Sequence, residues 1–174
     1  MAIMIVKQRK FAAAVTLIEV MLATAVLVIA ATGALSYQYY AARDAKIAHA
    51  QITGTRTAKL LLEDWMSTGG SEEYNPATLG LGFSPVSTIP SELVGFGSPL
   101  NNVVYGITVN ELPMLVMLTR SDVAYDTTSD VKLLQLIAIV KFGSVSGDKT
   151  AQQFIELIKP IILTTYVRVD AAGG

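Results

Sequence analysis

Residues 15–35 read VTLIEVMLATAVLVIAATGAL, an apolar run that contains a single charged residue, Glu19. An α-helix needs about 20 consecutive apolar residues to cross the hydrocarbon core of a bilayer, and this run has that length. The apolar core of a secretory signal peptide is shorter, about 7–15 residues. The run therefore predicts a helix that spans a membrane rather than a signal peptide that is removed whole.

Charged and aromatic residues flank the run asymmetrically. Lys7, Arg9 and Lys10 precede it, and the first ten residues contain no acidic residue. Tyr37, Tyr39 and Tyr40 follow it, where aromatic side chains favour the membrane–water interface. Because basic residues concentrate on the cytoplasmic side of membrane helices, we expect a single-pass protein with a cytoplasmic N-terminus and a globular domain on the other side.

The composition excludes several classes of function. The 174 residues include no cysteine and one histidine, so thiolate chemistry is impossible and histidine chemistry would depend on His49 alone. The net charge is −1, and three of the 13 basic residues precede the apolar run, so the other 10 face 14 acidic residues. An acidic body offers no field that attracts nucleic acid. We therefore expect neither an enzyme nor a nucleic-acid partner.

Glu19 is the residue in the run that most needs an explanation. A carboxylate at the centre of a membrane helix costs about 2.5–3.5 kcal/mol on insertion scales. One interpretation places Glu19 near the helix end, where its side chain reaches the lipid headgroups. The other is that Glu19 meets a positive charge when chains pack together, because opposite charges attract strongly in apolar surroundings.

Residues 10–20, KFAAAVTLIEV, resemble the class III signal of type IV prepilins and type II secretion pseudopilins. In that family a basic leader ends in a small residue, usually Gly. A hydrophobic residue, usually Phe, then precedes Thr-Leu-Ile-Glu-Val and an uninterrupted apolar helix. Here Ala14 and Val15 stand at those two positions, so the chain departs from the usual pattern at both. The resemblance covers roughly residues 7–66.

This resemblance implies a processing and assembly pathway. A prepilin peptidase would remove residues 1–14 and N-methylate Val15, whereas a cut before Phe11 would place Glu19 at the ninth position and break the family spacing. Thr16, Leu17, Ile18 and Glu19 would then serve assembly, with the Glu19 carboxylate paired to the Val15 ammonium of a neighbouring subunit. The implied partners are the prepilin peptidase, other pilin or pseudopilin subunits, an inner-membrane assembly platform and membrane lipid.

The resemblance also implies a location, the bacterial inner membrane, from which the subunit can be drawn into a periplasmic or surface filament. The short extramembrane domain without a C-terminal cysteine pair favours a minor subunit over the abundant shaft subunit. The alternative function is a signal-anchored periplasmic binding or enzyme domain whose membrane helix is not cleaved. A plain anchor has no use for Glu19 and retains residues 1–14, so Glu19 and cleavage discriminate between the two.

The remaining pattern predicts an α+β fold of pilin type. One helix is expected over Thr16–Met66, membrane-spanning over 15–36 and amphipathic over 37–67, with Gly33 and Gly54 either tolerated, closely packed, or a point where the helix melts. Residues 68–102, rich in Gly and Pro, predict a variable loop. Residues 103–174 predict an antiparallel sheet of about four strands. The expected elements are strands at 103–109, 114–120 and 131–142 and a turn at 143–149. Residues 152–159 are expected to form the return strand, although their phasing also permits a short helix, and residues 161–169 a last edge element or a tail.

Three aspartates mark a second candidate site. Asp122, Asp126 and Asp130 fall in the stretch SDVAYDTTSD, which we expect to be a loop. Grouped carboxylates can hold Ca²⁺, but the spacing does not match an EF-hand loop. A solvated acidic turn is therefore the favoured interpretation, and no cofactor is expected apart from this weak calcium candidate.

Overall fold

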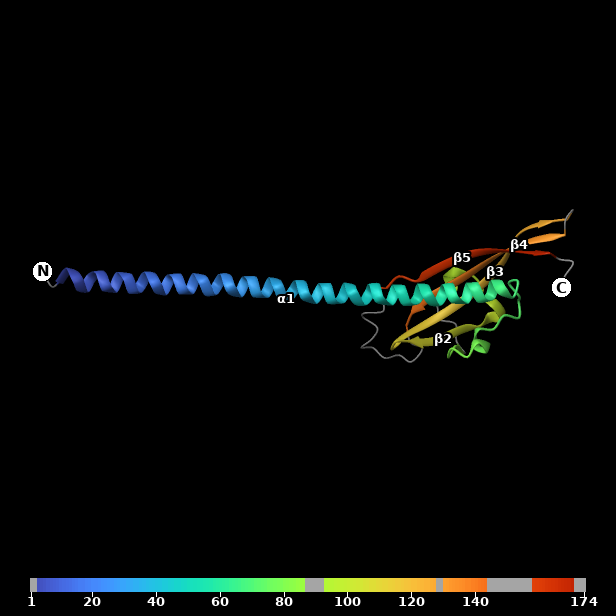
Figure 1. Ribbon diagram of the computed structural model, residues 1–174, viewed down its shortest axis with the longest axis horizontal. Coiled ribbons are helices and arrows are strands. Elements are labelled where there is room, and N and C mark those ends of the chain that lie inside the picture. Colours follow the sequence, from blue (N-terminus) through green and yellow to red (C-terminus); the bar gives the residue numbers. More distant parts are fainter. Residues whose placement is uncertain (1–2, 87–92, 128–129, 144–157, 171–174) are drawn as a thin grey trace. The chain divides into compact units, whose positions relative to one another are not determined.

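The structure is a computed structural model that describes residues 3–86, 93–127, 130–143 and 158–170, with side chains given from Thr16 onward except at Val94. It divides into two units, Met1–Lys46 and Ile47–Gly174. Figure 1 labels the helix and the strands that are described below. The helix α1 (Ile3–Ser67) contributes residues to both. Each unit is described separately below.

The helix α1 begins earlier than the sequence predicts and ends where it predicts. Its expected start at Thr16 is wrong, because no proline or glycine lies between Ile3 and Thr16 and the run Ala12–Ala14 favours helix. Its end is set by Gly69 and Gly70, which adopt φ values of 69° and 71°. The Gly70 N–H donates to the Trp65 carbonyl at 3.0 Å, which closes the helix.

Three hydroxyl groups of α1 in the first unit bond within the helix itself. Thr24 Oγ1 donates to the Met21 carbonyl at 2.9 Å, and Thr32 Oγ1 donates to the Val28 carbonyl at 2.7 Å. Ser36 Oγ donates to the Thr32 carbonyl at 2.9 Å. These hydroxyls therefore present no unsatisfied donor on an apolar helix surface.

The second unit contains a five-stranded antiparallel sheet, so the α+β class is confirmed and the expected number of about four strands is wrong. The order β1-β2-β3-β4-β5 is that of a meander. The strands are β1 (Ser84–Val86), β2 (Val104–Val109), β3 (Leu112–Asp126), β4 (Val131–Phe142) and β5 (Ile161–Asp170). The strand that the sequence did not predict is β1, three residues long and centred on Pro85, within the expected loop 68–102.

The turn between β2 and β3 is tighter than expected. Asn110 and Glu111 both have positive φ, 50° and 65°, and they alone separate the two strands. Pro113, which falls between the expected strands 103–109 and 114–120, is the second residue of β3 and pairs with Thr108. The Pro113 carbonyl accepts a hydrogen bond from the Gly143 N–H at 3.1 Å, so proline occupies a strand position without disrupting the pairing.

At the other end of β3 the pairing continues to Asp126, beyond the expected end at Arg120, and includes a bulge between Asp122 and Ala124. The predicted turn 143–149 and return strand 152–159 lie almost entirely outside the described residues. The predicted edge element is β5, whose ten residues pair antiparallel with β4.

The residues of α1 in the second unit cover one face of the sheet. The completely buried Ala58, Leu61 and Trp65 pack in one cluster with β-strand residues such as Leu136 and Phe142. Three 3₁₀ turns, Pro76–Leu79, Val94–Phe96 and Leu100–Asn102, separate the helix from β2. On the opposite face Leu93 closes a second, smaller cluster with Val104, Leu115, Met117 and Ile139.

Candidate functional site

The segment that resembles a prepilin signal is helical throughout. Ala14 and Val15 lie in α1, and their side chains are outside the described part of the chain. Thr16, Leu17, Ile18 and Glu19 occupy one turn of the same helix with exposed side chains. The structure therefore places these residues in succession along a helix, and it tests neither the cleavage nor the methylation that the sequence predicts.

Apart from Thr16, one turn before it, Glu19 has apolar neighbours along the helix. Leu17, Ile18, Val20, Met21 and Leu22 around it are all more than half exposed. Among the described side chains, which begin at Thr16 in this helix, none forms an ion pair with Glu19. A carboxylate on an apolar helical surface can stabilise an assembly when it forms an ion pair with a cationic group of another chain, because an unpaired buried charge is costly.

The helix that bears Glu19 is long and apolar enough to cross a membrane. Within Thr16–Ser67 the most apolar window has a mean hydropathy of 2.1, and none of that window is buried in the structure. The core helix of a soluble protein would be mostly buried, so this exposure agrees with the predicted membrane span. The observation concerns length and composition, and it gives no orientation.

The three aspartates do not form one site, and the expectation that they share a loop is wrong. Asp122 and Asp126 belong to β3, opposite Leu134 and Val131 of β4. Since Leu134 and Val131 are an odd number of residues apart on one strand, the two aspartates point to opposite faces of the sheet. Within the described residues no group of three or more acidic, histidine or cysteine side chains could hold a metal ion.

Asp130 instead bonds to Tyr125 at the end of the β3–β4 hairpin. Its carboxylate accepts a hydrogen bond from the Tyr125 hydroxyl at 2.6 Å. This bond, together with the negative charge of Asp130, raises the pKa of the Tyr125 hydroxyl. The Lys132 ammonium lies 5.7 Å from the centre of the Tyr125 ring. The β3–β4 hairpin therefore presents an exposed aromatic ring held between two charged side chains.

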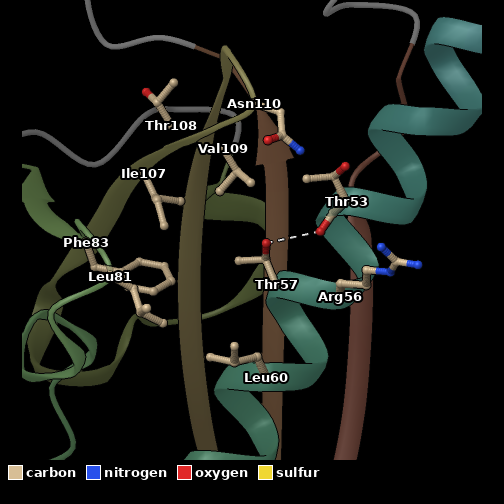
Figure 2. A pocket seen from close by; sticks show the side chains of 10 residues that line it. All are labelled: Thr53, Arg56, Thr57, Leu60, Leu81, Phe83, Ile107, Thr108, Val109 and Asn110. Carbon is tan, nitrogen blue, oxygen red and sulfur yellow. Dashed lines mark hydrogen bonds between the residues drawn. The ribbon is translucent and has the colours of Figure 1, made fainter.

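A hollow of about 500 Å³ lies between α1, β2 and the chain before β1 (Figure 2). Thr53, Arg56, Thr57 and Leu60 of α1 border it; in Figure 2 Thr57 and Leu60 point toward Phe83 and Leu81, whereas the guanidinium of Arg56 points away from them. Leu81 and Phe83 line it from the segment before β1, and Ile107, Thr108, Val109 and Asn110 line it from β2 and its turn. Its volume lies in the range of sites that bind small ligands or side chains.

The hollow is lined by apolar side chains together with hydroxyl and amide groups, and one charged residue borders it. Phe83 and Ile107 are buried, whereas Leu60 and Leu81 are 42% and 52% exposed. Thr57 Oγ1 donates to the Thr53 carbonyl at 3.0 Å and Thr53 Oγ1 to the His49 carbonyl at 2.9 Å, so neither hydroxyl needs a ligand. Arg56 is its one charged lining residue, and among the described residues it has no acidic partner.

Sequence reasoning did not find this hollow. The one-turn spacing of Thr53, Thr57 and Leu60 was visible, but the residues that complete the hollow lie in the expected loop 68–102 and on β2. No pattern along the chain links Leu81 to Ile107, because only the folded β2 brings them together. The one signal of this site in the sequence was Leu81, an apolar residue that stands between two glycines in the expected loop.

Comparisons with known protein families, with curated proteins and with solved structures give no match for this chain.

Proposed function

We propose that the protein is a structural subunit of the pilin or pseudopilin type. It would be a minor subunit of a type II secretion system or type IV pilus that assembles through its N-terminal helix. The observation that carries the proposal is Glu19, the one charged residue in an exposed apolar helical surface directly after a basic segment. The second unit supports it, because a helix packed on an antiparallel sheet is the fold that the resemblance implies.

The proposal assigns a role to each residue of the signal. A prepilin peptidase cuts between Ala14 and Val15 and methylates the new amino terminus. The Val15 ammonium of one subunit and the Glu19 carboxylate of its neighbour then form an ion pair within the bundle of helices. Either charge alone would be heavily penalised there, so the pair fixes the register between subunits.

The proposed location is the bacterial inner membrane, with the basic N-terminus in the cytoplasm and the sheet domain in the periplasm. Lys7, Arg9 and Lys10 support this orientation through the positive-inside rule. The runner-up, an uncleaved signal-anchored binding or enzyme domain, would have a use for the hollow beside Arg56 but none for Glu19.

The mass of the intact protein after extraction from bacterial membranes tests the proposal. In cells with an active prepilin peptidase, the chain should lack residues 1–14 and carry one additional methyl group on Val15. Replacement of Ala14 by a bulky residue should block the cut, because a site that favours glycine has little room there. Full-length protein in such cells would overturn the proposal in favour of the uncleaved anchor.

A further inference from the structure

The outer edge of β5 is an open strand edge of the sheet. β5 is the last strand in the sheet order, so only the edge that faces β4 is paired, and among the described residues no strand lies beyond it. β2 and β5 lie on opposite sides of β3 and β4 (Figure 1). Every second residue of an edge strand directs its N–H and C=O groups away from the sheet. The outer edge of β5 therefore presents a row of backbone donors and acceptors.

The two edges of the sheet differ in how they are protected. β1 has three residues, and its central residue, Pro85, has no N–H to donate. β5 has ten residues, contains neither proline nor glycine and pairs with β4 in an unbroken register. Its charged residues, Arg168 and Asp170, are confined to its end, where they pair with each other at 3.4 Å. β5 thus lacks the devices that usually prevent an edge strand from pairing with another chain.

The apolar core also stops short at β5. Four residues of this strand pack against the main cluster below α1 and are nevertheless only partly buried, namely Ile161, Leu163, Val167 and Val169. Thr165, on the same face, donates its hydroxyl to Sδ of Met66 in α1 at 3.2 Å. A strand added beside β5 would therefore complete the backbone pairing and the burial of this apolar row together.

A second copy of the chain is poorly suited to this edge. α1 and β5 run in the same direction, since Gly54 lies beside Ile161 and Met66 lies beside Thr165. Two β5 strands paired antiparallel about a twofold axis would hold their α1 segments in opposite directions, whereas the proposed function requires a common direction. β1 of another copy offers only three residues around a proline.

We propose that the outer edge of β5 binds an extended segment of a different protein, which adds a sixth strand to the five-stranded sheet. The backbone edge selects an extended chain, and the partly buried row selects aliphatic side chains at every second position of that chain. This docking site goes beyond the proposed function, which concerns the N-terminal helix. It rests on that function only for the exclusion of a second copy.

A peptide with the sequence of residues 132–141 of β4, KLLQLIAIVK, is the probe, because this sequence already pairs with β5 on its other edge. In that register Ile137 lies opposite Thr164, and Leu136 lies opposite Thr165. The full-length chain has no cysteine, so Thr164→Cys introduces a single thiol, and the chain is solubilised in detergent. Directly opposed residues have Cβ atoms about 4.5–5.5 Å apart. A peptide with Ile137→Cys should therefore form a disulfide with the chain, whereas one with Leu136→Cys, on the other face, should give at least about tenfold less product.

The matched control is Gln135→Cys in the full-length chain. Gln135 lies opposite Tyr166, so it shares a face with Thr164, but both edges of its strand, β4, are already paired. It should give no disulfide with either peptide.

N-methylation of the peptide backbone gives a second readout. Methyl groups on alternate residues remove the N–H groups of one peptide edge only. One alternate set should therefore weaken binding at least about tenfold, and the other should leave it unchanged. Adhesion to an apolar surface or to detergent would not distinguish the two sets.

Two full-length copies, one with Thr164→Cys and one with Tyr166→Cys, test the second copy as occupant. These residues would lie opposite each other in an antiparallel pair centred on Thr165. A disulfide between the two copies in membranes would assign the edge to a second copy and overturn the proposal. The proposal is also overturned if no peptide links to Thr164→Cys or if both N-methylated sets bind equally. None of these results depends on cleavage after Ala14, so the mass of the chain tests the proposed function separately.

Discussion

Gly54 of α1 lies so close to Phe142 of β4 that a Cβ atom at Gly54 would come within 2.8 Å of the ring carbon Cζ. The same atom would lie 2.7 Å from Cδ1 of Ile161. The Ile161 side chain end can move, but the Phe142 ring is 99% buried and cannot. Of the possibilities left open for this glycine, close packing is therefore the one the structure supports.

Gly54→Ala should destabilise the sheet domain. Overpacking of a core costs about 1–3 kcal/mol, and the gain in helix propensity returns about 1 kcal/mol. We expect a net loss of up to about 2 kcal/mol and a fall of up to a few degrees in the thermal midpoint of the detergent-solubilised chain. Gly33→Ala is the matched control, because no atom lies within 4 Å of the Cβ position at Gly33. An equal effect of both substitutions would contradict this explanation.

Trp65 and Tyr74 should anchor the end of α1 to the chain that follows it. Their rings stack with centroids 5.5 Å apart, and Trp65 Nε1 donates to the Ser71 carbonyl at 2.8 Å. Trp65→Ala should cost about 3–5 kcal/mol, as expected for a large buried aromatic side chain. Tyr74→Phe retains the stack and loses only the hydroxyl, so it should cost about 1 kcal/mol. Chemical denaturation of both variants measures the difference.

Tyr74 should also titrate later than a free tyrosine. Burial raises the pKa of its hydroxyl, and the hydrogen bond and charge of Asp64 raise it further. The folded chain therefore disfavours the phenolate, and the contribution of Tyr74 to stability should be present below pH 10 and decline as the pH rises above that value. Ultraviolet titration of the native chain and of Tyr74→Phe should differ by one late tyrosine. A difference that appears near pH 10 would contradict the prediction.

Glu19→Ala should leave membrane insertion intact or improve it, since it removes a costly charge. Incorporation into the filament or complex should nevertheless fall at least about tenfold, because the Val15 ammonium of the neighbour loses its counter-charge. Glu19→Gln should fail almost as completely, and Glu19→Asp should be intermediate. Co-purification with the other subunits after cross-linking in membranes measures incorporation.

Glu63→Ala is the control for that series. Glu63 is an exposed acid on the same helix and lies 3.5 Å from Lys59, a surface pair worth about 0.3–0.5 kcal/mol. Its replacement should not change incorporation. Normal incorporation of Glu19→Ala would leave Glu19 as a carboxylate that reaches the headgroups.

Local signals in the sequence predicted much of this fold. The apolar run 15–35 and the pair Gly69–Gly70 act within a few residues, so the exposed helix and its end could be predicted. β4 could be predicted because its residues are apolar on both faces. The far end of β3 could not, because Ser121, Asp122 and Asp126 are polar and join the sheet only through pairing with β4.

The two candidate sites also differ in how far the sequence alone could predict them. The signal 10–20 is contiguous, so the sequence alone leads to Ala14, Val15 and Glu19 as candidates. The hollow joins residues more than 50 positions apart, from Thr53 to Asn110, and β1 holds only three residues around a proline. Such features depend on tertiary contacts that no local pattern encodes.

Three hydroxyl groups in the apolar half of α1 affect how this helix can move between lipid and protein surroundings. Because Thr24, Thr32 and Ser36 each donate to a carbonyl within the preceding turn, the helix can exchange acyl chains for protein neighbours without breaking these three hydrogen bonds. Its partition between the two surroundings then depends on the shape of its apolar surface and on the one charged residue, Glu19. For a helix with this surface, lipid and protein surroundings would therefore compete through packing rather than through hydrogen bonding.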